Sequence, residues 1–240
     1  TDEQLAKLDM TRYEAICAAL ITYVAVQEGG HTEDHSGMTK WTDDTQLPNA
    51  AGSYYLMTDV TLTETWTLAN GDVNLCLNGH SITMNGNDEV IQINKFATLT
   101  LYDCSNSATG KGKITHGTSY TGSGVQVKGT FNMYDGVISD NTAENSAGVN
   151  VFGGTFNMYG GTIRDNKATT GNGGGVYVES GTNSSSRFNM HGGTISDNTA
   201  ARWGGGVSVY NATFYMTGGT ITGNKASSGG GVSLSSGALF

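Results

Sequence analysis

The sequence predicts an all-β fold: a single-stranded parallel β-helix of about 25 residues per coil, preceded by an N-terminal α-helical cap. Two observations predict the coils. A bulky apolar residue recurs at a nearly fixed interval, and apolar residues alternate with polar ones inside each interval. The phenylalanines that begin the copies are Phe131, Phe156, Phe188, Phe214 and Phe240, which are 25, 32, 26 and 26 residues apart.

Each copy repeats the same internal spacing. Phe131 and Met133 open one copy, Ile138 follows five residues after the methionine, and the valine pair Val149/Val151 closes it. Side chains at i and i+2 share one face of a strand, so each copy predicts two short strands with a bend near the isoleucine. One copy cannot bury its own inward face, whereas stacked copies bury a continuous column of Phe, Met, Ile and Val.

An asparagine recurs three residues after each isoleucine of the repeat. Asparagine tolerates tight turns, and its amide can bond the equivalent amide of the next coil. We therefore expect a structural ladder inside the solenoid, formed by Asn141, Asn166, Asn198 and Asn224.

The region before the clear repeats divides into three parts. Residues 1–28 have a helical apolar rhythm and are expected to cap the solenoid, 29–53 form a polar linker, and 54–240 form the β-helix. Upstream, weaker copies fit the Phe, Met and Ile positions with Leu75/Leu77 and Ile82, then Leu99/Leu101 and Ile114. Ile91/Ile93 and Val125/Val127 fit the valine pair.

Two insertions are expected as loops outside the coils. The stretch from Tyr102 to Lys113 separates residues that other copies place five apart, and Thr182 to Arg187 enlarges the 32-residue copy. Insertions of solenoids collect on one face, which is often the working face.

Composition and charge restrict the function. The chain has 36 glycines in 240 residues, about twice the usual share, as expected for a fold with many turns. Its net charge of −9 argues against a nucleic-acid partner.

The chain begins at Thr1, and Phe240 stands where a new copy would start. These ends predict a piece of a longer protein, with further coils or another chain at the open C-terminal end. No segment is expected to insert into a membrane.

The cysteines leave two alternatives open. Cys76 is expected to point outward between two inward leucines, and Cys104 lies one coil later. A bridge between them and two separate thiols are both compatible with the sequence, and because the chain has three cysteines, Cys17 included, at least one is unpaired.

Several segments carry a family resemblance. Ile138–Ala143 and Ile195–Ala200 both read Ile-Ser-Asp-Asn-Thr-Ala, and with Gly204–Val207 they resemble repeats of adhesin-like β-helix proteins of bacterial surfaces. Chlamydial polymorphic membrane proteins look like distant relatives of this pattern, and Leu75–Ile82 is similar to repetitive surface proteins of gut Firmicutes. The resemblance implies right-handed coiling, display at the bacterial cell surface or outside the cell, and adhesion. It names no ligand.

Binding residues are expected on outward positions of the strands. Amides beside aromatic rings suit a glycan, because sugar hydroxyls pair with amides and sugar C–H faces pack on rings. The alternative is that neighbouring rings only stack between coils. The candidates are Asn132, Tyr134, Asn157, Tyr159, Asn189 and His191, with Tyr177 in a second, weaker column that also contains Gln126, Asn150, Ser208 and Ser233.

No catalytic, metal or cofactor site is expected. A β-helix hydrolase needs two carboxylates at a fixed separation. Asp140, Asp165 and Asp197 instead recur in register, as turn residues do. His31 and His35 lie in the predicted linker, without a helix to align their imidazoles.

The function predicted from the sequence is a non-enzymatic, adhesin-like β-helix of a bacterial surface or secreted protein, with glycan or a surface protein as partner. The alternatives are a polysaccharide lyase or glycoside hydrolase, and a structural stalk that makes no specific contact.

Overall fold

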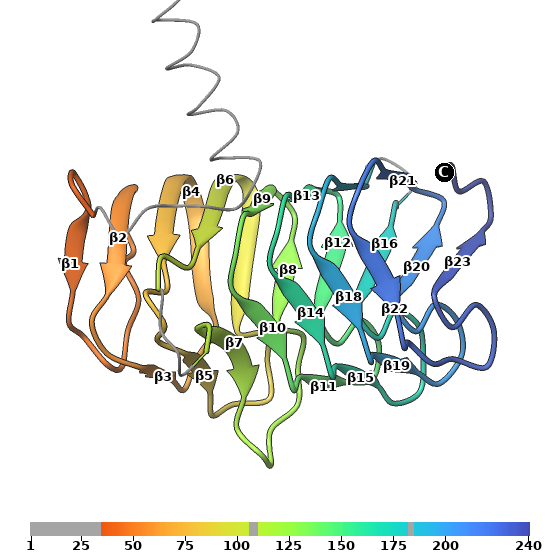
Figure 1. Ribbon diagram of the computed structural model, residues 1–240, viewed down its shortest axis with the longest axis horizontal. Helices are drawn as coiled ribbons and strands as arrows, with labels where there is room; N and C mark the ends of the chain where they lie inside the picture. Colours follow the sequence, from red (N-terminus) through yellow and green to blue (C-terminus); the bar gives the residue numbers. More distant parts are fainter. Residues whose placement is uncertain (1–34, 106–109, 182–184) are drawn as a thin grey trace, which may run out of the picture.

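The computed structural model describes residues 35–105, 110–181 and 185–240, and it confirms the predicted fold class. Every regular element in these ranges is a strand, and every strand pair is parallel. Three sheets of 13, 7 and 3 strands run along one solenoid, with β1 near one end and β23 at the other (Figure 1). The expected helix 1–28 lies outside the described residues.

The 13-stranded sheet contains the valine and phenylalanine strands. Its long strand β6 pairs through its first residues with β8 and through its last residues with β9. One long strand in the early coils therefore becomes two short strands in each later coil. The strands are β1 (Thr39–Trp41), β2 (Gly52–Leu56), β4 (Trp66–Cys76), β6 (Ile91–Tyr102), β8 (Val125–Val127), β9 (Thr130–Met133), β12 (Val149–Phe152), β13 (Thr155–Met158), β16 (Val176–Glu179), β17 (Arg187–Met190), β20 (Val207–Tyr210), β21 (Thr213–Met216) and β23 (Val232–Ser235).

The two smaller sheets complete the coils. The 7-stranded sheet holds the isoleucine strands, which are β3 (Val60–Leu62), β5 (Ile82–Met84), β7 (Lys113–His116), β10 (Val137–Ser139), β14 (Thr162–Arg164), β18 (Thr194–Ser196) and β22 (Thr220–Thr222). The 3-stranded sheet contains β11 (Thr142–Ala143), β15 (Lys167–Ala168) and β19 (Thr199–Ala200). A later coil thus has three or four short strands, where the sequence predicted two.

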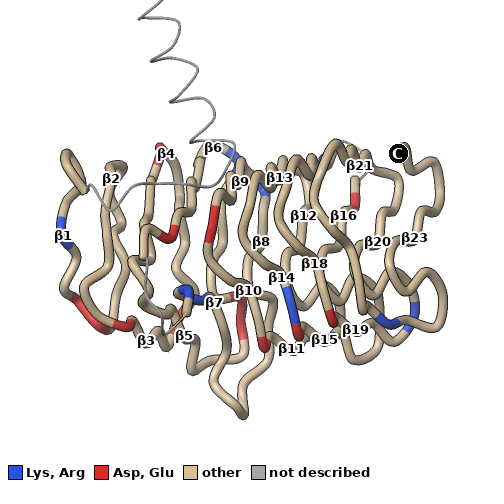
Figure 2. Tube along the Cα trace, viewed as in Figure 1, with Lys and Arg blue, Asp and Glu red and all other residues tan. Residues whose placement is uncertain are grey.

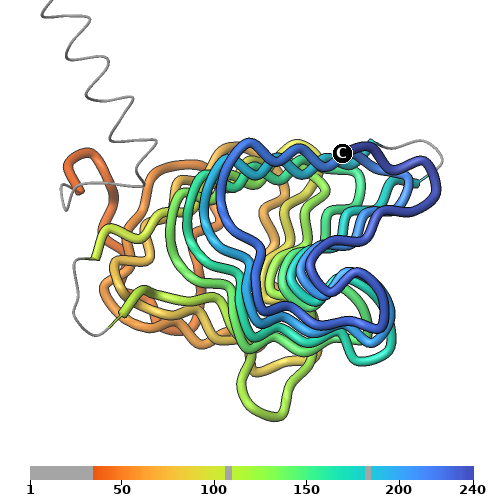
Figure 3. The backbone as a smooth tube through the Cα atoms, turned by 45° about the vertical axis from the view of Figure 1, so that its right-hand side comes forward, coloured from red at the N-terminus to blue at the C-terminus, as the bar shows by residue number. Residues whose placement is uncertain are grey.

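The strand register confirms the predicted repeat. Phe156 pairs with Phe131 on one side and with Phe188 on the other, and the rings stack at centroid distances of 5.0 and 4.8 Å. The paired isoleucines and valines are buried in the same way. Figure 3 shows coils of similar outline stacked one behind another along the solenoid.

The predicted upstream register is confirmed for Leu99/Leu101, which pair with Phe131 and Met133, and is wrong by two residues for the coil before. Leu75 pairs with Leu101, and therefore the phenylalanine position of that coil is Val73 rather than Leu75. A shift of two keeps every side chain on its own face, so alternation alone cannot detect it. The first strand also lies earlier than expected, since β1 falls within the predicted linker 29–53.

The buried amide ladder is confirmed. Oδ1 of Asn166 accepts hydrogen bonds from the backbone N–H and from Nδ2 of Asn141, at 3.1 and 3.0 Å, and Asn198 and Asn224 repeat both contacts. Each turn before the ladder needs a left-handed residue. Asp140 has a φ of 60°, and Gly223 has a φ of 66° in the last such turn.

Both predicted insertions interrupt the strand pattern. β6 ends at Tyr102 and β7 begins at Lys113, so the first insertion lies between these strands as predicted, although both end residues assigned to it are strand residues. In the second insertion, residues 182–184 are outside the described ranges. Arg187, which was assigned to the loop, is the first residue of strand β17.

Candidate binding face

The phenylalanine strands β9, β13, β17 and β21 form the face that contains most of the predicted binding residues. Along each strand the apolar side chains point inward, so the alternate positions point outward. Parallel pairing then aligns equivalent outward residues in columns along the solenoid. We call this surface the amide–ring face. Its two main columns are Thr100, Asn132, Asn157, Asn189 and Tyr215, and Tyr102, Tyr134, Tyr159, His191 and Thr217.

The asparagines of this face form a second ladder, on the outside of the solenoid. Nδ2 of Asn157 donates to Oδ1 of Asn132 at 2.8 Å, and Nδ2 of Asn189 donates to Oδ1 of Asn157 at 2.7 Å. All three side chains are half-buried. An amide nitrogen carries two hydrogens, so each asparagine keeps one N–H for an outside acceptor. The sequence placed these residues together but missed their mutual bonds.

The second column is a continuous stack of aromatic rings. Tyr134 lies 5.1 Å from Tyr102 and 4.6 Å from Tyr159, and His191 continues the stack 5.0 Å from Tyr159. Interplanar angles of 12 to 15° make these contacts face to face. Nδ1 of His191 is 2.9 Å from the Thr217 hydroxyl, which prolongs the column by one coil.

This stacking changes what the rings can offer a ligand. Each ring uses its faces against the rings of neighbouring coils, so the expected packing of sugar C–H faces on these rings has no room inside the stack. The ring edges and the phenolic hydroxyls remain. The alternative in which the rings stack between coils is therefore present in the structure.

Two tyrosine hydroxyls of the stack, those of Tyr102 and Tyr134, favour their neutral, donating form. Burial raises the pKa of Tyr102 above its ordinary value of 10.0, and the nearby Tyr134 adds a smaller contribution. Burial likewise raises the pKa of Tyr134, with Tyr159 as the second cause. Because both groups stay protonated through neutral and mildly alkaline pH, each can donate a hydrogen bond there.

The end of the face nearer the C-terminus has a feature that the sequence did not single out. The guanidinium of Arg187 lies 5.5 Å from the ring centroid of Tyr215, and Tyr215 is exposed. This is a cation–π distance. The register between β17 and β21 places these residues on adjacent strands of the face. Because Arg187 was predicted to lie in the loop that begins at Thr182, its contact with Tyr215 was not predicted.

Tyr177 belongs to a separate column, on the valine strands. It pairs with Asn150 on one side and with Ser208 on the other. Burial, followed by the Glu179 carboxylate, raises the pKa of Tyr177 to about 12. Asn172 lowers the pKa by a hydrogen bond, but this effect is smaller than the two that raise it. The structure thus separates Tyr177 from the other six predicted residues.

The recurring aspartates lie elsewhere, in the turns that leave the 7-stranded sheet. Asp140, Asp165 and Asp197 are exposed and left-handed, with φ values between 56 and 60°. Lys113 is 3.6 Å from Asp140, and Arg164 pairs with Asp165. Figure 2 shows acidic segments along this edge, near the labels β11, β15 and β19. Their shared geometry fits the predicted turn role.

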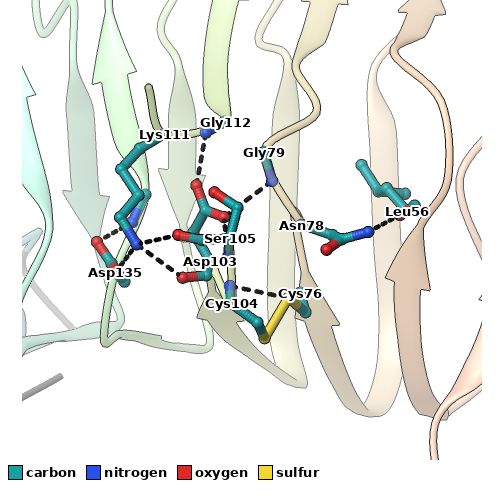
Figure 4. Close-up of a disulfide and its surroundings, with 11 residues drawn as sticks. Leu56, Cys76, Asn78, Gly79, Asp103, Cys104, Ser105, Lys111, Gly112 and Asp135 are labelled. Carbon is teal, nitrogen blue, oxygen red and sulfur yellow. Dashed lines mark hydrogen bonds and ion pairs between the residues drawn. A yellow bond between two sulfur atoms is a disulfide. The ribbon is translucent and has the colours of Figure 1, made fainter. Parts of the chain in front are cut away.

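The loop after β6 is anchored by a buried carboxylate and a disulfide. Asp103 accepts hydrogen bonds from the backbone N–H groups of Gly79, Ser105 and Gly112 (Figure 4). The structure joins Cys76 to Cys104 across two coils, which decides between the alternatives that the sequence left open. Cys76 takes an outward strand position, as expected, but the loop buries it completely.

Comparison with known proteins adds no relative. No family model, no curated protein and no solved structure matches the chain. Among the residues that the structure describes, no helix has the length and apolarity to cross a membrane.

Proposed function

We propose that this chain is an adhesin-like module of a bacterial surface or secreted protein, and that its amide–ring face binds a glycan through many weak polar contacts. The observation that carries the proposal is the pair of adjacent columns, one of amides and one of phenols. Asn132, Asn157 and Asn189 occupy three successive coils, and Tyr134 and Tyr159 run beside the first two of them.

The chemistry of the columns suits a hydroxyl-rich polymer. Each outer amide has one N–H beyond those in its ladder, and each tyrosine offers a hydroxyl group. Sugar hydroxyls can accept from both groups. We expect contact through these polar edges rather than through ring faces, since the faces are occupied by stacking.

Repetition supplies the affinity that a single contact lacks. A rigid solenoid presents identical donors one coil apart, about 4.8 Å. When one contact of a linear polymer forms, the next sites are held close to its neighbouring sugars, so the effective concentration is high. Weak contacts can then sum to useful avidity without a deep pocket.

A disulfide and the family resemblance support a location outside the cell. The Cys76–Cys104 disulfide is of the kind that persists in oxidising compartments. The family resemblance of the repeats points the same way.

The test is retention on immobilised polysaccharides and host glycans, with released sugar ends measured in the same wells. The informative variant is Tyr134→Phe combined with Tyr159→Phe, which removes two hydroxyls and keeps the stacked rings. Each lost hydrogen bond is worth about 1 kcal/mol, so we expect retention to weaken by about 10- to 30-fold. The matched control is Thr162→Ala combined with Thr194→Ala on the 7-stranded sheet, which should bind like the parent chain.

The remaining outcomes reject the proposal in distinct ways. Release of sugar ends would identify an enzyme. Retention that the tyrosine variant leaves unchanged would place the site away from the amide–ring face. Failure to retain any glycan would favour a protein partner or a structural stalk.

A further inference from the structure

Three metal-binding side chains from separate parts of the chain meet beside the loop that follows β6. His35 precedes β1, Cys76 is the last residue of β4, and Cys104 follows β6 by two residues. One ring nitrogen and the two sulfur atoms all lie within 4.8 Å of one another. Sequence spacing could not reveal this group, because 41 and 28 residues separate its members.

One ring nitrogen of this histidine is buried without a partner in the part of the chain that the structure describes. Nε2 of His35 is buried and has no hydrogen-bond partner within the described ranges. The ring is fixed, because it stacks on Tyr55 at a centroid distance of 4.1 Å and an angle of 12°. Tyr55 pairs with Cys76 in the strand register. A buried polar nitrogen without a partner is unusual in a folded protein and requires an explanation.

We propose that reduction of the Cys76–Cys104 bond turns this group into a binding site for a thiophilic d10 cation, Zn²⁺ or Cu⁺. In the disulfide state the sulfurs are bonded to each other, and the site is closed to metal. A dithiol reductant supplies two electrons and two protons to the disulfide and leaves as a disulfide itself. The metal then displaces both thiol protons and binds two thiolates and the neutral His35 imidazole.

The donor set selects this class of cation. Thiolate and imidazole donors suit Zn²⁺ and Cu⁺, whereas Ca²⁺ and Mg²⁺ require oxygen ligands. Zn²⁺ is also found with two cysteines, one histidine and a water. The two positive charges of Zn²⁺ balance the two thiolates, and Cu⁺ leaves one negative charge, which favours Zn²⁺ because Cys76 and Cys104 are only 0% and 3% exposed.

The required movement is small. Two thiolates on one tetrahedral zinc stand about 3.8 Å apart, given Zn–S bonds of about 2.3 Å. The Cα atoms of Cys76 and Cys104 are 6.2 Å apart, so side-chain rotation can separate the sulfurs without moving the strands. The backbone N–H of Cys104 already lies 3.1 Å from the Cys76 sulfur, where it would support a thiolate.

The surrounding loop keeps its anchors when the disulfide opens. Asp103 holds three backbone N–H groups, and Lys111 donates to the backbone oxygens of Asp103 and Ser105 and pairs with Asp135 at 2.8 Å (Figure 4). None of these contacts involves a sulfur atom. Reduction should therefore leave both cysteines near their present positions.

The experiment uses the full chain with Cys17→Ser, so that the third cysteine cannot contribute. The protein is prepared with the disulfide intact or reduced by a phosphine, without oxygen, and titrated with Zn²⁺ or Cu⁺ against a chromophoric chelator. We expect one equivalent of metal in the reduced protein and none in the oxidised protein. Co²⁺ in place of Zn²⁺ should give thiolate-to-metal charge-transfer absorption.

Variants assign the ligands. Cys76→Ser combined with Cys104→Ser should abolish binding, and His35→Ala should weaken it by about tenfold or more while leaving the disulfide able to form. His80→Ala is the matched control, because His80 is a partly exposed histidine near the same loop, and it should bind like the parent chain. The proposal is overturned if the reduced chain takes up neither metal, if the double serine variant still binds, or if His35→Ala has no effect.

Discussion

The imidazole of His116 closes one end of the buried amide ladder, with its Nδ1 atom 2.7 Å from Oδ1 of Asn141. The other ring nitrogen lies 2.8 Å from the backbone oxygen of Asp88. By register, Gly117 occupies the ladder position of this coil, so no amide is available there. His116 therefore supplies the contact that an asparagine makes in later coils.

Replacing His116 with alanine should destabilise the protein by about 1 to 3 kcal/mol. The change leaves the Asp88 carbonyl and Oδ1 of Asn141 without this partner in a site where His116 is only 6% exposed. Equilibrium urea unfolding, followed by circular dichroism, measures the difference. His80→Ala removes a histidine with a partly exposed ion pair and should cost less than about 1 kcal/mol. Equal effects of the two variants would show that His116 does not support the ladder.

The inner and outer amide ladders should differ in their contribution to stability. Asn166→Ala removes a buried side chain that accepts twice from Asn141 and donates to Ile138 and Asn198, so a loss of about 3 kcal/mol or more is expected. Asn157→Ala breaks the outer ladder at a half-buried position, where water can replace the bonds. Its cost should be below about 1 kcal/mol.

Thermal and urea unfolding of the two alanine variants, measured side by side, test this difference. Both substitutions remove the same chemical group from a parallel column, so they control for each other. A larger loss from Asn157→Ala than from Asn166→Ala would contradict the assignment of the inner ladder as the structural one.

Residues that recur in every copy could be placed from the sequence, whereas residues that act at one coil only could not. Phe131, Ile138 and Asn141 recur at fixed spacing, and in a parallel solenoid equal spacing becomes strand register. His116 has no equivalent in the other copies, so no pattern marked it as a cap. Its role depends on where the chain places Asp88, and that position is fixed only in three dimensions.

At the candidate site, too, the repeated residues were predicted and their individual contacts were not. Asn132, Asn157 and Asn189 were predicted to lie together because they repeat, yet their mutual bonds depend on side-chain rotation that a sequence does not show. The meeting of His35 with Cys76 depends on the path of the chain before β1, where no copy of the repeat exists to compare.

Each valine strand that has a further coil stacked on it should require glycine at the preceding position, because that coil leaves no room for a Cβ. A Cβ on Gly175 would lie 2.6 Å from the Gly206 carbonyl oxygen and 2.9 Å from the Ile195 side chain. The first neighbour is backbone and cannot move away. We expect Gly175→Ala to destabilise the protein by about 1 to 3 kcal/mol in urea unfolding.

The equivalent glycine of the last coil supplies the control. A Cβ on Gly231 meets only Ile221, at an ordinary contact distance of 3.9 Å. Gly231→Ala should therefore be neutral, or stabilise slightly by restricting the unfolded chain. If both alanine variants unfold at the same urea concentration, close stacking of the coils is not the reason for glycine at this position.

Alkaline pH should destabilise the protein through Tyr177. Burial and the Glu179 carboxylate raise the pKa of Tyr177 from 10.0 to about 12 in the folded chain. Between these values the unfolded chain loses the phenolic proton while the folded chain keeps it. The folded state then binds more protons, so the free energy of unfolding falls as pH rises through this window. Below pH 10 the stabilisation from Tyr177 is fully present.

Urea unfolding at pH values below 10 and above 12 measures this fall in the free energy of unfolding. The fall should be smaller in Tyr177→Phe, because phenylalanine has no proton to lose. Tyr120→Phe, which removes an exposed tyrosine, should keep the full pH dependence of the parent chain. An unchanged dependence in Tyr177→Phe would assign the alkaline loss to other groups.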